Sequence, residues 1–127
     1  MSIVTVTLNP AIDQTILVNN FEPNEVNRVQ SMQLDAGGKG VNVASFLADF
    51  GLSVTVTGFL GLKNATIFEE HFHAKGIDDR FIYLPGYTRT NIKIMDNARQ
   101  QTTDINNAGE APAIGALIEL DNILSEL

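Results

Sequence analysis

Cysteine is absent from the sequence, and basic residues are few: eight lysines and arginines stand against fifteen aspartates and glutamates. The lack of cysteine excludes disulfide bonds and thiolate-metal sites and suits a reducing compartment, so we expect a cytoplasmic protein. The formal net charge of -7 argues against a nucleic-acid partner, because phosphate backbones bind basic surfaces. A few local cations still suffice to bind one phosphate group of a small molecule.

Long hydrophobic runs are also missing, so we expect no membrane-spanning segment and no membrane partner. Met1 leads directly into the strand-like segment Ile3–Leu8 without a basic region, and we therefore expect no signal peptide. The 127 residues correspond to one domain, and no repeat, low-complexity tract or linker divides them.

The order of hydrophobic periods predicts an α/β fold. Residues 3–8, 52–58 and 81–84 have the short apolar pattern of strands. Between them the period becomes helical, from Gly37 to Gly51 and from Ala65 to Gly76. Strands that alternate with helices favour a parallel sheet joined by right-handed crossovers.

The two predicted helices have expected ends and a buried face. We expect one stripe of the first helix to face the core and Gly51 to end that helix. The stripe consists of Val43, Phe46, Leu47 and Phe50. We expect Asn64 to cap the second helix and Gly76 to end it.

Three further strand-like segments do not fit this alternation. They are residues 12–18, 89–96 and 102–107. We expect them to form a small separate sheet, a lid over one end of the molecule, with a loop from Asn19 to Arg28. Pro112 is expected at the first position of a last helix, in which an apolar stripe from Ala113 to Leu127 requires burial.

The glycine-rich segment Gly37-Gly38-Lys39-Gly40 precedes the first helix after an irregular stretch. Glycines let a backbone approach a ligand closely, and a helix N-terminus favours an anion. Lys39 adds a positive charge, and Asn42 lies in the first turn. The spacing matches neither a Walker A loop nor a dinucleotide fingerprint. From these residues alone, a turn that merely starts a helix remains the alternative.

Two charged side chains are further candidates for a ligand site. Asp13 follows the first strand, where ligands of parallel sheets bind, and its carboxylate can accept hydrogen bonds from sugar hydroxyls. Arg89 begins a strand with a basic face, and its guanidinium suits phosphate oxygens. A turn aspartate and a solvated strand face are the alternatives. His71 and His73 point in different directions on one helix, and we expect no metal site.

Motifs in the same order as in a known family extend over residues 3–109. Among them are Thr5-Val6-Thr7-Leu8-Asn9-Pro10-Ala11-Ile12-Asp13, Gly37-Gly38-Lys39-Gly40-Val41-Asn42, Asn24-Glu25-Val26-Asn27-Arg28, Gly58-Phe59-Leu60-Gly61 and Thr88-Arg89-Thr90-Asn91-Ile92-Lys93. The sequence resembles the PfkB branch of the ribokinase-like carbohydrate kinases. Within that branch it is most similar to the 1-phosphofructokinase and tagatose-6-phosphate kinase subfamilies.

The resemblance implies a ribokinase-like α/β fold, in which helices flank a parallel sheet and a small β lid spans residues of about 12–34 and 87–108. In many members the lid mediates dimerisation, so a homodimer is expected. By the same resemblance Asp13 binds sugar hydroxyls, and Gly37, Gly38 and Asn42 shape the sugar site. Lys39 and Arg89 hold the phosphate already on the sugar, and Arg28 is a candidate for that phosphate or for a dimer contact.

The implied reaction is ATP-dependent phosphorylation of a ketohexose phosphate. Fructose 1-phosphate is the first expected substrate, and tagatose 6-phosphate or fructose 6-phosphate is the alternative. In the family the catalytic base and the sites for ATP and Mg²⁺ lie in a C-terminal half with a Gly-Ala-Gly-Asp motif. That motif does not occur here, so residues 1–127 are expected to be the N-terminal half only, or a truncated non-catalytic sugar-phosphate-binding module. Lys63-Asn64 replaces a common aspartate-asparagine pair.

Overall fold

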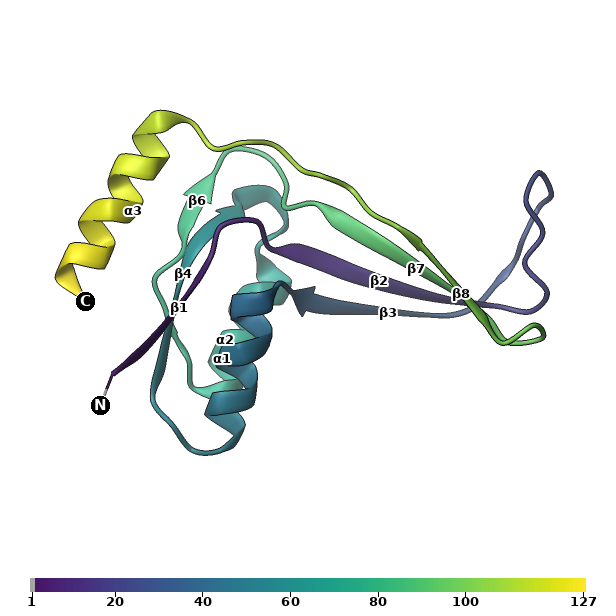
Figure 1. Cartoon of the computed structure of the whole chain (residues 1–127), viewed down its shortest axis with the longest axis horizontal. Coiled ribbons are helices and arrows are strands. Elements are labelled where there is room, and N and C mark those ends of the chain that lie inside the picture. Colours follow the sequence, from purple (N-terminus) through teal and green to yellow (C-terminus); the bar gives the residue numbers. More distant parts are fainter. Residues whose placement is uncertain (1) are drawn as a thin grey trace.

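The computed structural model describes residues 2–127 and contains two separate β-sheets (Figure 1). The core sheet consists of β1 (Ile3–Thr7), β4 (Val54–Gly61), β5 (Asp78–Asp79) and β6 (Ile82–Leu84), and every pairing in it is parallel. The helical elements are α1 (Lys39–Asp49), η1 (Leu62–Asn64), α2 (Thr66–Lys75) and α3 (Ile114–Glu126). The predicted alternation of parallel strands and helices is confirmed. No helix among residues 2–127 is long and apolar enough to cross a membrane.

The two faces of β4 separate two hydrophobic clusters, because successive strand residues point to opposite sides. Val54, Val56 and Leu60 pack with the buried residues of α1 and α2. In that cluster the rings of Phe72 and Phe81 stack with centroids 5.6 Å apart. Phe59 points the other way and packs with Ile82 of β6 and with Leu120 of α3.

The outer sheet has the strand order β3-β2-β7-β8 and extends away from the core sheet and its helices (Figure 1). Its strands are β2 (Ala11–Val18), β3 (Val29–Gly37), β7 (Thr90–Asp96) and β8 (Gln101–Ile105). β2 pairs in parallel with β7, and the two outer pairings are antiparallel. The predicted separate sheet is therefore present, with one more strand than the sequence indicated.

The additional strand, β3, is a correction to the sequence analysis. The sequence predicts a loop up to Arg28 and an irregular stretch before the glycines, whereas residues 29–37 form nine residues of strand. Their alternation is weak because most of their side chains are exposed. Pairing with β2, from Ala11–Gly37 to Val18–Val29, holds them in the sheet. The glycine-rich segment therefore follows a strand.

The buried face of α1 also differs from the expected stripe. Val41 and Ala44 are fully buried, while Phe46 and Phe50 are 63% and 71% exposed. The cause is close packing of the helix start on β1: a Cβ atom at Gly40 would collide with the Thr7 hydroxyl. The side of α1 with small residues therefore lies on the sheet, and its aromatic side faces outward.

The N-terminal ends of α2 and α3 differ from the prediction, whereas Gly51 and Gly76 end their helices as predicted. Gly51 and Gly76 have φ angles of 82° and 66°, the left-handed conformation of a helix end. Ala65, and not Asn64, is at the N-cap of α2, and the Asn64 side chain bonds to Thr88 instead. The N-cap of α3 is Ala113, so Pro112 precedes the helix.

The leucine stripe of α3 is only partly buried. Leu120 is buried, while Leu117, Leu124 and Leu127 are each at least 40% exposed. Ala116 and Ile123 pack beside Leu120 against the core sheet instead. The helix therefore contacts the sheet along a narrower line than its apolar pattern predicted.

Candidate functional site

A cleft of about 440 Å³ lies where the core sheet meets the outer sheet. The end of β1, the start of β2, the first turn of α1 and the start of β7 supply its walls. Its lining residues are Val6, Thr7, Leu8, Asn9, Ala11, Asp13, Gly38, Lys39, Gly40, Asn42, Arg89 and Asn91. Five of the seven residues predicted for the site belong to this cleft or touch it directly: Asp13, Gly38, Lys39, Asn42 and Arg89.

Gly37 and Gly38 leave no room for side chains at the junction of β3 and α1. A Cβ atom on Gly37, the last residue of β3, would collide with the Asp13 carboxylate of β2, and Gly38 has a φ angle of 122°. No side chain caps the helix at Gly38, and the first intrahelical bond is donated by the Asn42 N–H at 2.9 Å. The N–H groups of the first turn therefore point toward the cleft without helical partners.

Asp13 is the carboxylate of the cleft. It is half-buried and lies opposite Asp35 in the β2–β3 ladder. Burial raises its pKa above the usual 3.8, the Asp35 charge raises it further, and the Lys93 and Arg89 charges act in the opposite direction. A partly desolvated carboxylate is suited to accept hydrogen bonds from neutral hydroxyls.

Lys39 and Arg89 contribute the two cations of the cleft. Lys39 is exposed in the first turn of α1, and no carboxylate of residues 2–127 forms an ion pair with it. Arg89 is half-buried, and its guanidinium donates to three backbone carbonyls: Pro10 at 3.3 Å, Asn107 at 2.8 Å and Asn9 at 3.0 Å. Two of its five N–H groups remain for an anion.

Arg28 lies at the opposite end of the outer sheet from the cleft. The β2–β3 ladder runs from Ala11–Gly37 beside the cleft to Val18–Val29 at the far end, and Arg28 precedes Val29. The structure therefore does not bring Arg28 together with Lys39 and Arg89 within one chain. Its predicted role at the phosphate or at a dimer contact stays a prediction.

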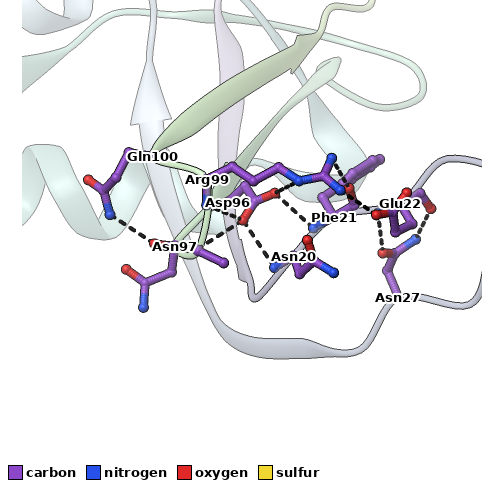
Figure 2. A network of polar contacts seen from close by, with 9 residues as sticks. Asn20, Phe21, Glu22, Asn27, Asp96, Asn97, Arg99 and Gln100 are labelled. Carbon is purple, nitrogen blue, oxygen red and sulfur yellow. Dashed lines mark hydrogen bonds and ion pairs between the residues drawn. The ribbon is translucent and has the colours of Figure 1, made fainter.

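The loop before Arg28 is held to the β7–β8 turn by a polar network (Figure 2). The Asp96 carboxylate, only 6% exposed as a residue, accepts the backbone N–H groups of Asn20, Phe21, Ala98 and Arg99 at 2.8–3.1 Å. Burial acts to raise the Asp96 pKa, but these N–H groups outweigh it and hold the pKa below its usual value. Arg99 also pairs with Glu22.

Two residues of the cleft were not singled out from the sequence. Thr7 is buried, and its hydroxyl has no hydrogen-bond partner among the described residues. Asn91 is named in the sequence analysis only within the motif from Thr88 to Lys93. It lines both the cleft and a neighbouring hollow of about 380 Å³ on the polar face of the outer sheet. Asp13 is shared by the two spaces, so they form one continuous polar region.

Comparison with known proteins identifies the family. The model of the pfkB family of carbohydrate kinases matches residues 6–124, so the chain belongs to this family. It is 50% identical over 127 residues to 1-phosphofructokinase of Rhodobacter capsulatus, covering all of this chain and 40% of that protein. It is 43% identical over 107 residues to 1-phosphofructokinase of Escherichia coli K12, covering 84% of this chain and 34% of that protein. The chain thus spans 40% or less of these curated relatives.

Solved structures agree with this assignment. A possible 1-phosphofructokinase from Thermotoga maritima superimposes with a TM-score of 0.81 at 33% identity, over 99% of this chain and 40% of that one. Phosphofructokinase-2 from Escherichia coli, solved with substrates and products, gives a TM-score of 0.91 at 21% identity, over 100% and 41% of the two chains. The latter likeness establishes the fold alone. The predicted ribokinase-like fold and PfkB membership are confirmed.

Proposed function

We propose that this chain supplies the sugar-phosphate site of an ATP-dependent kinase that converts fructose 1-phosphate to fructose 1,6-bisphosphate. The observation that carries the proposal is the cleft, which places Asp13, Lys39 and Arg89 around an uncapped helix N-terminus. The relatives at 43–50% identity are named 1-phosphofructokinase, which favours fructose 1-phosphate over the other ketohexose phosphates.

In this proposal each residue has a defined role. The Asp13 carboxylate accepts hydrogen bonds from two sugar hydroxyls, and Asn42 adds an amide at the rim of the same space. Gly37 and Gly38 leave room for the sugar beside the backbone. Lys39 and the first-turn N–H groups of α1 bind the phosphate already on the sugar, because a helix N-terminus and an ammonium group both favour an anion.

Arg89 completes the phosphate site. Its two unused N–H groups provide a further charge-assisted contact, typically worth about 1.5–3 kcal/mol. Its three bonds to backbone carbonyls keep the guanidinium at the junction of the two sheets. Arg28 would reach a phosphate only from another copy of the chain.

ATP and a divalent cation such as Mg²⁺ are implied by the kinase family. Among residues 2–127 no group of three or more His, Asp and Glu side chains could hold a metal ion. In line with the family resemblance, we assign the catalytic base and the nucleotide and Mg²⁺ sites to a part of the protein outside these residues. The reaction takes place in the cytoplasm in this proposal.

The outer sheet would serve both as a lid and as a dimer interface. Its register places polar side chains, such as Asp13, Lys93 and Asp104, on the face that lines the hollow. The opposite face is mixed: it has polar residues such as Gln14 and Thr103, and its apolar residues are Ile16, Met32, Leu34, Ile92, Ile94 and Ile105. Met32, Leu34 and Ile105 are each about half exposed, and a second copy of the chain would cover them.

A binding and turnover experiment on the full-length protein tests the proposal. We expect ATP-dependent phosphorylation of fructose 1-phosphate, with weaker use of fructose 6-phosphate and of tagatose 6-phosphate. Arg89→Ala should weaken binding of fructose 1-phosphate more than binding of unphosphorylated fructose. Equal losses for both sugars would remove Arg89 from the phosphate site, and binding without turnover would favour a non-catalytic sugar-phosphate-binding module.

A further inference from the structure

Asn64 and Thr88 are joined by a reciprocal pair of hydrogen bonds. Asn64 ends η1, just beyond the carboxyl end of β4, and Thr88 lies two residues before β7. The Asn64 Nδ2 donates to the Thr88 carbonyl at 2.9 Å, and the Asn64 Oδ1 accepts the Thr88 N–H at 2.7 Å. One side chain thus satisfies both backbone groups of Thr88 and fixes the direction of the chain there.

The same segment is held by further contacts with the core. Thr88 is only 7% exposed, and its hydroxyl accepts the Gly61 N–H at 2.8 Å. A Cβ atom on Gly61 would collide with the backbone of Tyr87 and Thr88, so the two segments lie in direct contact. The Lys63 N–H donates to the Gly86 carbonyl at 2.9 Å. Residues 86–88 are therefore fixed to the carboxyl end of β4.

Arg89 follows this fixed segment directly and extends the connection to the outer sheet. Its carbonyl accepts the Ile12 N–H at 2.9 Å, and its guanidinium donates to carbonyls on both sides of the junction, at Asn9 and Asn107. A shift of Thr88 would move the Cα of Arg89 and with it the guanidinium. Asn64 itself does not line the cleft that contains Lys39.

We propose that Asn64 is a positioning residue for phosphate binding, which fixes Thr88 and through it aims the Arg89 guanidinium into the cleft. This inference rests on the proposed function, in which Arg89 binds the phosphate of the sugar. Asn64 lines a neighbouring hollow with Arg89 but not the cleft with Lys39, so in this proposal it acts on the phosphate through Arg89. Its contribution should therefore depend on the presence of the Arg89 side chain, and it should be specific for phosphorylated ligands.

A double-mutant cycle on the full-length protein tests this dependence. Binding of fructose 1-phosphate and of unphosphorylated fructose is measured for Asn64→Ala, Arg89→Ala and the double variant, with thermal melts alongside. We expect Asn64→Ala to raise the dissociation constant for fructose 1-phosphate about tenfold, the scale of one hydrogen bond to a charged group. In the Arg89→Ala background the same change should have almost no further effect.

Two additional variants keep the experiment decisive. Thr66→Ala removes an exposed polar side chain two residues away and should bind both sugars like the wild type. If Asn64→Ala fails to fold, Asn64→Asp replaces it, since the carboxylate still accepts the Thr88 N–H but repels the Thr88 carbonyl. Asn64→Asp should therefore show the same selective loss.

The outcomes separate this inference from the proposed function. If Arg89→Ala leaves the affinity for fructose 1-phosphate unchanged, the phosphate role of Arg89 fails and the inference fails with it. If Arg89→Ala weakens binding but Asn64→Ala does not, only the inference is overturned. Losses that add fully in the double variant, or a loss from Asn64→Ala that is equal for fructose and fructose 1-phosphate, also overturn the inference alone.

Discussion

Among single residues, Asp13 is subject to opposing influences from its neighbours. Gly37 leaves room for its carboxylate, Asp35 lies opposite it, and Lys93 and Arg89 draw its charge in the other direction. Because its pKa in the fold lies above 3.8, ionisation of Asp13 costs stability at neutral pH, and the fold tolerates this cost. A carboxylate kept at a cost to stability is typical of a binding residue.

Asp13→Asn separates binding from stability. The change keeps the size of the side chain but exchanges one acceptor oxygen for a donor, and we expect it to weaken sugar-phosphate binding by about 1.5–3 kcal/mol. Since an ionised Asp13 destabilises the fold, the melting temperature should stay within a few degrees or rise. Titration calorimetry and a thermal melt measure both effects. A variant that unfolds but binds normally when folded would identify Asp13 as a structural residue of β2.

The sequence offered Asp13, Lys39 and Arg89 as candidates through the family resemblance, and the structure brings all three to one cleft, while their binding roles stay predictions. The bonds of Arg89 to Asn9 and Asn107 were not predictable, since the first joins residues 80 positions apart and depends on how the two sheets meet. The unpartnered hydroxyl of Thr7 gives no signal in the sequence for the same reason. Local chemistry was thus readable, whereas contacts across the fold were not.

Among the secondary-structure elements, α1 shows why the apolar period alone misassigned a face. Its aromatic stripe is the stronger hydrophobic signal, but Gly40 and Ala44 allow a closer approach to the sheet.

The contact between α1 and α2 is polar as well as apolar. Ser45 Oγ and His71 Nε2 lie 2.6 Å apart, and Ser45 also bonds to the Val41 carbonyl at 2.9 Å.

His71 should make the stability of this helix pair depend on pH. Burial, and then the charge of Lys75, lower its pKa below 6.5, while Asp49 and Asp35 act in the opposite direction. The unfolded chain therefore binds a proton at a higher pH than the fold does, so stability is complete above 6.5 and falls as the pH drops below it. Thermal melts between about pH 7 and about pH 5 measure the loss.

A pair of substitutions assigns this dependence to one histidine. His71→Gln should reduce the fall in melting temperature on acidification, whereas His73→Gln, at an exposed position of the same helix, should retain it. Equal pH profiles for the two variants would place the responsible group elsewhere.

The loop between β2 and β3 should depend on Asp96. Since its carboxylate accepts four backbone N–H groups, Asp96→Ala should release residues 19–28 without unfolding the core sheet. Hydrogen exchange at Asn20 and Phe21 should become faster by at least about tenfold, while exchange in β4 stays slow. Asp104→Ala, on an exposed strand position, is the control. Unchanged protection at Asn20 would show that the loop is held by other contacts.

On the scale of the whole molecule, the two sheets differ in how far the sequence predicts them. The parallel core was predictable because its strands and helices alternate with clear periods. The outer sheet was only partly predictable, since β3 gains its structure from pairing with β2. Large apolar side chains remain exposed on β1 and α1, among them Val6, Phe46 and Phe50. Val6 also lines the cleft, whereas Phe46 and Phe50 do not.

The 127-residue chain alone should therefore bind hydrophobic probes and lack kinase activity. Exposed apolar area costs roughly 25 cal/mol per Å² in water, and the chain contains no Gly-Ala-Gly-Asp motif to supply a base. We expect the dye ANS to fluoresce strongly with the isolated chain and more weakly with a Phe46→Ser, Phe50→Ser variant. A coupled ATP assay with fructose 1-phosphate should show no turnover. A sharply melting monomer that phosphorylates fructose 1-phosphate would contradict the assignment of catalysis to residues outside this chain.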